Sequence, residues 1–312
     1  MKKLTIMKKL TTILIAIIGF GSISLAQQDV QFTQYFWNKL LLNSGYAGSH
    51  DNASFTLIHR DQWMGIVDDG RPVSSAFSFH TPLRNEKIGI GFSALRDNLG
   101  PTENTTLAAD FAYRIRIADD SRLAFGVKAS LDFFEAQLVG LTGTNGDPAF
   151  AQNFGGNTLP NFGASLYYWS GNAFLGASAP QLLENELAES NNTLQGIERR
   201  HYFIMGGYVF DISPLFKFKP TFMAKLESSS PASFDATANF LFKEKLWLGA
   251  AYRSEDSFDA NIAYLFSSSF RAGFAWDFTT SELRNVNDGS WEVMLGYDLN
   301  FNKEKLMSPR YF

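Results

Sequence analysis

Apolar and polar residues alternate with a period of two along most of this chain. Successive side chains of a β-strand point to opposite faces, so the alternation predicts strands with one apolar and one polar face. At 290–301, Trp291, Leu295 and Tyr297 share the apolar face, and Glu292 and Asp298 lie on the other. Fourteen segments of this kind follow residue 52. They are 53–60, 73–80, 86–95, 106–117, 122–134, 159–169, 172–179, 201–211, 215–227, 232–242, 245–253, 257–266, 269–278 and 290–301.

The alternation also fits a soluble β-sandwich, which turns its apolar faces inward, but the connections favour a membrane protein. Short joins lie at 81–85, 118–121, 170–171, 212–214, 243–244 and 267–268, and long ones at 61–72, 96–105, 135–158, 180–200 and 279–289. Turns on one side and loops on the other are typical of transmembrane barrels. Most segments also approach the roughly 9–11 residues of a tilted spanning strand. We therefore predict an all-β, transmembrane, antiparallel up-and-down β-barrel of about fourteen strands. The sequence leaves twelve or sixteen strands as alternatives, because the connections at 228–231 and 254–256 are short where long loops are expected.

Both chain ends carry the marks of an exported barrel. Residues 1–26 combine four lysines, an apolar run and the small-x-small end Ser24-Leu25-Ala26, which predicts a cleaved signal peptide. At the other end, Phe312 follows an amphipathic strand and resembles the signal read by barrel-assembly machinery. We predict export to the cell outer membrane, with the barrel over 53–312.

The composition agrees with a barrel in outer-membrane lipid. Beyond the signal peptide no apolar run is long enough for a spanning helix. Aromatic residues make up 15%, including 30 Phe, which suits a lipid-facing band with aromatic girdles. Cysteine is absent, which leaves no disulfide or thiol site. The net charge is −4, and loss of the four leader lysines makes it −8, which argues against nucleic acid as a partner.

No arrangement of residues predicts an enzyme or a cofactor site. The histidines follow no metal-ligand spacing, and no Gly-x-Ser-x-Gly elbow occurs. The loop at 140–157 and the run 68–70 contain oxygen ligands without the spacing of a calcium loop, so surface turns are favoured. Scattered histidines on strands are more often lumen or interface residues; they are His50, His59, His80 and His201.

The segment 27–52 stands apart from the barrel pattern. Phe32, Phe36 and Leu40 recur at i, i+4 and i+8, and Asn43-Ser44-Gly45 supplies a stop. This spacing predicts a short amphipathic helix. The helix either plugs the barrel lumen or lies in the periplasm.

Within and just after this segment the chain resembles a known family. The matching residues are 31–35, Asn38, 43–49, 60–65 and Pro72, with weaker matches at 110–115, 123–126 and 310–312. They resemble the PorP/SprF family, outer-membrane proteins of the type IX secretion and gliding-motility apparatus of Bacteroidota. The resemblance implies a component that supports export or surface anchoring of large adhesins, or of other cargo with C-terminal sorting domains. It also implies periplasmic type IX secretion components as partners.

The resemblance supplies candidate partner-binding residues. Trp63 is the sharpest, because an aromatic side chain beside Arg60 and Gln62 is a good contact anchor, although it can equally pack into the barrel mouth. The candidates are Gln31, Phe32, Gln34, Tyr35, Asn38, Asn43, Tyr46, Gly48, Arg60, Gln62 and Trp63. The alternative function is a passive outer-membrane channel for small or hydrophobic solutes, for which the strand count and a lumen plug are also suitable.

Overall fold

The computed structural model describes residues 30–66, 70–83, 86–139, 153–185, 198–227 and 231–299. The predicted signal peptide, Phe312 and most of the loop at 140–157 lie outside the described residues, as do Asp68 and Asp69.

The described chain is built almost entirely of strands. Their bounds are β1 Ala53–Asp61, β2 Pro72–Pro82, β3 Ile88–Leu99, β4 Thr102–Arg116, β5 Arg122–Ala136, β6 Phe154–Trp169, β7 Ala173–Ala179, β8 His201–Tyr208, β9 Phe210–Ser213, β10 Phe216–Glu227, β11 Ser233–Phe242, β12 Leu246–Arg253, β13 Ser257–Leu265, β14 Phe270–Thr279 and β15 Ser290–Leu299. Each of the fourteen predicted segments overlaps at least one of these strands, and 201–211 overlaps two. No helical turn in the described residues is long or apolar enough to cross a membrane.

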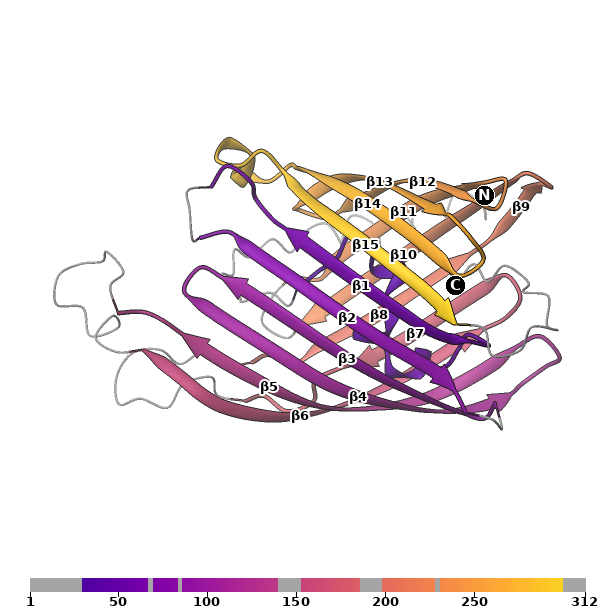
Figure 1. Ribbon diagram of the computed structural model, residues 1–312, viewed down its shortest axis with the longest axis horizontal. Helices are drawn as coiled ribbons and strands as arrows, with labels where there is room; N and C mark the ends of the chain where they lie inside the picture. Colours follow the sequence, from indigo (N-terminus) through magenta and orange to yellow (C-terminus); the bar gives the residue numbers. More distant parts are fainter. Residues whose placement is uncertain are drawn as a thin grey trace, which may run out of the picture.

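The strands form one closed antiparallel barrel (Figure 1). Neighbours along the chain pair with one another, and β1 pairs with β15 from Ala53↔Leu299 to Asp61↔Trp291. β8 and β9 are separated by Val209 alone and both pair with β10, so the fifteen labelled strands make a fourteen-stranded wall. We call the end with the short β2–β3, β4–β5 and β6–β7 joins the turn side, and the opposite end the loop side. The predicted barrel is confirmed.

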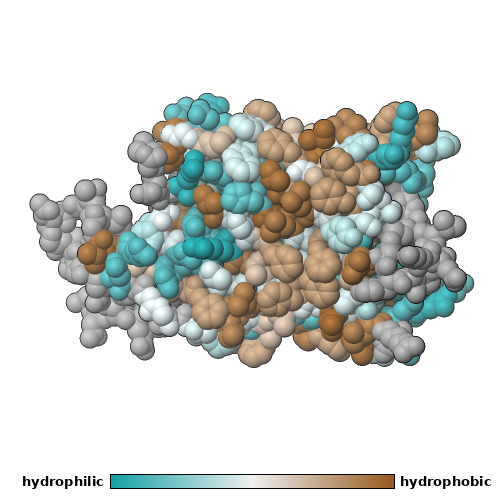
Figure 2. All heavy atoms as spheres, viewed as in Figure 1, coloured by the Kyte–Doolittle hydropathy of each residue, from teal (hydrophilic) through white to brown (hydrophobic). Residues whose placement is uncertain are grey.

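The alternation places apolar side chains outside and polar ones in the lumen. In β5, Phe125 and Val127 are 48% and 56% exposed, whereas Lys128 and Asp132 are 6% and 2% exposed. Figure 2 shows apolar side chains gathered over the middle of the outer wall, with hydrophilic ones mostly toward its ends. A closed barrel satisfies its backbone hydrogen bonds internally, so this outer surface can face lipid.

Aromatic side chains form a girdle at the turn side. Phe216 and Phe218 both stack on Phe240, with ring centroids 5.5 and 4.9 Å away. Farther round, Phe266 lies between Tyr264 and Phe270, at 5.0 and 5.5 Å. Such rings are typical of the membrane–water boundary.

The structure corrects the loop predicted at 96–105. β3 continues to Leu99 and β4 starts at Thr102, so the connection is a tight turn with Gly100 at φ 56°. The sequence of these residues resembles a loop because strands that extend beyond the membrane on the loop side meet water on both faces. Such strands do not need an apolar face, so the alternation of apolar and polar residues is missing there. β4, β5 and β6 have 15, 15 and 16 residues, against 8 in β12, and β5 and β6 reach farther than the other strands in Figure 1.

A second correction concerns the single strand predicted at 201–211, which is interrupted at Val209. Val209 is fully buried, and its N–H donates at 2.8 Å to the carbonyl of Asn172, which directly precedes β7. On the other side the register of β10 passes from Phe218↔Phe210 to Thr221↔Gly207. Pro220 lies in this gap and has no N–H for a ladder bond, which explains the break.

Residues 30–52 lie inside the barrel, seen as short coils behind the strands in Figure 1. The predicted amphipathic helix is wrong: the segment has three 3-10 turns, Tyr35–Trp37, Lys39–Leu41 and Ser44–Tyr46. Phe32, Phe36 and Leu40 are all at most 5% exposed, so the apolar spacing marks buried positions correctly. The helical path is interrupted at Asn38, which has φ −132° and ψ 61°, and the side chains meet different parts of the wall instead of one helix seam.

Candidate functional site

The candidate site is the lumen, which residues 30–50, here called the lumen segment, cross from the loop side to the turn side. Near its start Thr33 contacts β14 and β15, and farther on Ser44 contacts β6. Between them Tyr35 Oη lies 3.2 Å from Thr221 Oγ1 on β10, and the Ser78 hydroxyl on β2 donates to Asn38 Oδ1 at 2.7 Å. The segment therefore contacts the inner wall on several sides.

At the loop side the segment is held by what we call the charged seat, formed by Thr33 and Gln34 with Arg60, Asp277 and Glu292. The N–H groups of Thr33 and Gln34 donate to the two Glu292 carboxylate oxygens at 2.8 and 2.9 Å. The Thr33 hydroxyl lies 2.8 Å from both Asp277 oxygens. Arg60 lies 2.6 Å from Asp277 and 3.4 Å from Glu292. All three charged side chains are at most 3% exposed, so each depends on the others for compensation.

The charged seat continues into a row of ionisable side chains across the barrel wall. Arg253 Nε on β12 lies 3.2 Å from Asp235 Oδ2 on β11, and Asp259 on β13 is the register partner of Asp277. With Arg60 and Glu292, six neighbouring strands each contribute one buried charge. The row has four carboxyl groups and two guanidinium groups, which makes the loop-side half of this wall acidic.

At the turn side lies the close-packed seat, formed by residues 43–48 against Gly89, Gly126, Ser165 and Gly176. Ser165 Oγ accepts from the Gly45 N–H at 2.7 Å and lies 2.7 Å from Ser44 Oγ. Asn43 Nδ2 donates to the Leu166 carbonyl at 3.0 Å, and its Oδ1 accepts from the Gly45 N–H. No charged side chain takes part in these bonds.

Glycines in the wall make the close-packed seat possible. A Cβ on Gly126 would lie 2.1 Å from the Gly45 nitrogen, and one on Gly89 would lie 1.9 Å from the Ala47 carbonyl oxygen. At Gly176 it would lie 2.9 Å from Asn43 Nδ2. Sequence reasoning missed these residues, although glycine inside a strand often marks the close approach of another backbone.

Lysine and aromatic side chains fill the centre of the lumen. Lys39 is fully buried, donates to the Phe36 carbonyl at 2.8 Å and lies 4.9 Å from the Tyr46 ring centroid. Lys219 of β10 lies 5.8 Å from the Trp37 ring, and that ring meets Trp247 edge to face at 5.7 Å. Ammonium groups over aromatic faces are attracted by the ring quadrupole. This centre therefore joins the lumen segment to β10 and β12.

Where the lumen segment approaches the turn side, the structure brings together two histidines that the sequence left scattered. The rings of His50 and His80 are 5.1 Å apart, and Tyr46 Oη lies 2.9 Å from His50 Nε2. The Gly48 N–H donates to His80 Nδ1 at 3.1 Å, and Arg114 donates to the Gly48 carbonyl. Gly48 has φ 65°, so this turn favours glycine. Among the described residues no group of three or more potential ligands is placed to hold a metal ion.

The predicted partner-binding residues fall into two groups. Phe32, Gln34, Tyr35, Asn38, Asn43, Tyr46, Gly48 and Arg60 are buried in the lumen, where they contact the barrel itself. Trp63, Gln62 and Gln31 are partly exposed. Trp63 and Arg60 do not form one patch, because Arg60 points into the lumen and Trp63 lies at the loop-side rim, where its backbone N–H donates to Ser290 Oγ at 3.1 Å.

Comparison with known proteins identifies both a family and a fold. A family model described as "Type IX secretion system membrane protein PorP/SprF" matches residues 24–297. No curated protein matches the sequence at a significant level.

Solved structures give the fold. The Ralstonia pickettii toluene transporter TbuX is 10% identical in sequence, with a TM-score of 0.53. The match covers 84% of this chain and 93% of the transporter chain. The CymD monoaromatic hydrocarbon channel is 11% identical with a TM-score of 0.52, over 92% and 97%. A Pseudomonas aeruginosa FadL homologue is 12% identical with a TM-score of 0.50, over 83% and 93%. At this identity the likeness shows an outer-membrane barrel fold.

Proposed function

The chain belongs to the PorP/SprF family of type IX secretion system membrane proteins, and from this premise we propose that it is a plugged membrane platform of that system. In this role it supports export or surface anchoring of large adhesins, or of other cargo with C-terminal sorting domains. Its partners are the secreted cargo at the loop side and periplasmic type IX secretion components at the turn side. The chain performs no catalysis.

The observation that carries the proposal is the lumen segment. Gln34, Lys39, Leu40 and Asn43 are fully buried between the barrel walls, and bonds at both ends of the segment hold it there. A barrel whose lumen is filled by its own chain is better suited to the role of a scaffold than to that of an open pore. The extended strands β3 to β6 give this scaffold a raised rim on the loop side.

The candidate partner residues take two different roles in this proposal. We assign the buried ones, such as Gln34, Asn43 and Arg60, to seating the lumen segment. Trp63 and Gln62 remain the candidates for direct contact with cargo, because they lie at the loop-side rim with partly exposed side chains. Replacing Trp63 by Ala should release cargo without changing the barrel.

The proposal is tested by comparing surface and culture-fluid proteomes of cells with and without the gene. We expect one large surface protein to leave the surface or appear in the fluid, while other secreted proteins keep their place. A strain that produces Trp63→Ala should share that defect, and Trp291→Ala is the matched control within the wall. If no secreted protein changes place, the platform role is wrong.

A passive channel for small or hydrophobic solutes is the second candidate. It is favoured by a cavity beside the lumen segment and by the similar structures of a toluene transporter and a monoaromatic hydrocarbon channel. Liposomes that contain the purified barrel should then take up such a solute faster than protein-free liposomes. Equal uptake would contradict the channel role.

A further inference from the structure

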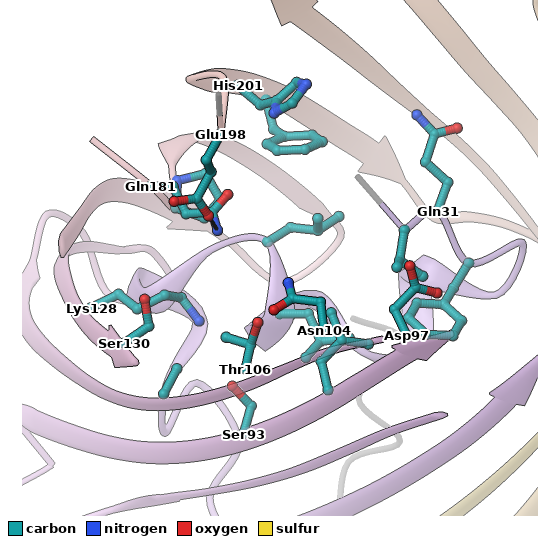
Figure 3. A pocket seen from close by; sticks show the side chains of 18 of the residues that line it. Gln31, Ser93, Asp97, Asn104, Thr106, Lys128, Ser130, Gln181, Glu198 and His201 are labelled. Carbon is teal, nitrogen blue, oxygen red and sulfur yellow. Dashed lines mark hydrogen bonds between the residues drawn. The ribbon is translucent and has the colours of Figure 1, made fainter. Parts of the chain in front are cut away.

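A cavity of about 190 Å³ lies at the loop side of the lumen segment. The segment forms one wall of the cavity, with Phe32, Tyr35 and Leu42, and β8 and β10 add Phe203 and Met223. Figure 3 shows Ser93, Asn104, Thr106 and Ser130 from β3, β4 and β5 on one side, with Gln181, Glu198 and His201 across from them.

Among the charged and titratable side chains that line the cavity, Asp97, Lys128, Glu198 and His201 have partners, whereas Arg199 is exposed. Lys128 Nζ lies 3.0 Å from Asp110 Oδ1, and His201 Nε2 lies 3.0 Å from Glu227 Oε2. Asp97 accepts from the Ser74 hydroxyl at 2.6 Å. An ion in the buried part of the cavity would compete with these pairs, so this part suits an uncharged ligand.

Three neutral polar groups in the lining have no hydrogen-bond partner among the described residues. They are Nδ2 of Asn38, Oδ1 of Asn104 and Oγ of Ser130. Asn38 and Ser130 are only 3% and 5% exposed, and a buried polar atom without a partner is costly. The three groups offer one amide donor, one carbonyl acceptor and one hydroxyl that serves as either.

We propose that this cavity is a binding site for one uncharged amphipathic molecule that carries a hydroxyl or amide group on an apolar body. The polar group bonds to Ser130, and the apolar body packs against the leucine and aromatic side chains of the lining. Asn104 lies four ladder positions from Ser130, because Ser130 pairs with Ala108, so the same polar group does not reach both. Because the ligand touches both the lumen segment and the wall, it stabilises the seated position of the segment. The site goes beyond the platform role and does not rest on it.

The test uses the full-length barrel in lipid nanodiscs, with 4-phenyl-1-butanol as the probe. Its two matched compounds are butylbenzene, which lacks the hydroxyl, and 4-phenylbutyrate, which is charged. Calorimetric titration should show one saturable site for the alcohol and binding about tenfold weaker for each of the other two. Equal affinities, or no saturable binding of the alcohol, would overturn the proposal, including the case in which the polar groups bind water alone.

Variants locate the site. Ser130→Val removes the hydroxyl and should weaken alcohol binding about tenfold while leaving butylbenzene unchanged. Ser178→Val is the matched control, because Ser178 is another buried serine without a hydrogen-bond partner among the described residues and lies outside the cavity lining. Equal loss in both variants would overturn the site assignment.

A photolabel gives a readout that does not depend on a variant folding. A diazirine-bearing benzyl alcohol should label peptides from 30–42 and from 93–108 in the wild-type barrel. Excess 4-phenyl-1-butanol should suppress this labelling. Labels confined to lipid-facing positions such as Phe125 and Val127 would contradict the proposal.

Discussion

The charged seat and the close-packed seat hold the same lumen segment by different physical means. At the charged seat, backbone N–H groups meet the carboxylate of Glu292, and Arg60 compensates the buried negative charge. At the close-packed seat, the hydrogen bonds of residues 43–45 are neutral, and the fit depends on wall glycines that leave room for Gly45 and Ala47. Charge therefore determines how the lumen segment binds at the first seat, and shape determines how it binds at the second.

This difference indicates how each seat responds to change. Removing one member of a buried ion network leaves an uncompensated charge, and the cost is large. A shape-based seat tolerates polarity changes better but has no room for an added carbon atom. The two seats are therefore separable by substitution, and native-state hydrogen exchange of the segment amides measures the opening free energy of each.

The largest effect is expected for Arg60→Met. The substitution leaves Asp277 and Glu292 buried together without their cation, so the opening free energy at Thr33 and Gln34 should fall by about 3–5 kcal/mol. Amides at 44–47 should keep most of their protection. Mass-spectrometric hydrogen exchange on the purified barrel measures both regions in one experiment.

Arg96→Met is the control for this change. Arg96 pairs with Glu103 at 2.7 Å across neighbouring strands, but the two side chains are 59% and 40% exposed. An exposed pair contributes less than about 1 kcal/mol. Equal loss of protection in the two variants would mean that burial does not give the charged seat its strength.

Gly126→Ala should have the next largest effect, at the other seat. The added Cβ would lie 2.1 Å from the Gly45 nitrogen, and the backbone on both sides is fixed by hydrogen bonds. Protection of amides 44–47 should fall by about 3 kcal/mol, while Thr33 and Gln34 change little.

Its matched control is Gly155→Ala, because a Cβ there meets only the Glu135 side chain, at 3.5 Å. If Gly126→Ala leaves the exchange of 44–47 unchanged, the segment does not depend on a close approach to β5.

The sequence predicts the polar face of the wall but not the contacts that either seat makes with the lumen segment. The period-two pattern predicts the wall and puts Asp277 and Glu292 on its polar face, because each strand repeats the same local rule. It says nothing about which strands face one another across the lumen, so the contacts of Thr33 with residues more than 240 positions away are not predictable. Close approach at Gly126 depends on the same unknown alignment.

The error at 27–52 has a related cause. A spacing of i, i+4 and i+8 marks a helix when its apolar residues pack against one surface. Inside a barrel, Phe36, Leu40 and Tyr46 find apolar neighbours in several directions, and the wall determines the path of the chain. Local spacing then predicts burial but not conformation.

Ser165→Ala should have a smaller effect than either substitution above. It removes one of the two acceptors of the Gly45 N–H, leaving Asn43 Oδ1, and it removes the partner of the Ser44 hydroxyl without adding bulk. Protection of Gly45 should fall by about 1–2 kcal/mol. Ser178→Ala is the control, since that buried serine has no hydrogen-bond partner among the described residues and its loss should cost the segment nothing measurable.

The smallest effect expected is the coupling between the seats, which the double variant Arg60→Met, Gly126→Ala measures. The seats share no side chain, so their free-energy changes should add to within about 0.5 kcal/mol. The double-mutant cycle requires hydrogen exchange to be measured at amides 33–34 and 44–47. The four proteins compared are the wild type, the two single variants and the double variant. A single variant that lowers protection at both seats would mean that the segment opens as one unit, and coupling of about 2 kcal/mol would mean that loss of one seat weakens the other. Additivity together with single-variant effects confined to the substituted seat would mean that either end opens alone, so that a partner on one side of the membrane can displace its end without signalling to the other.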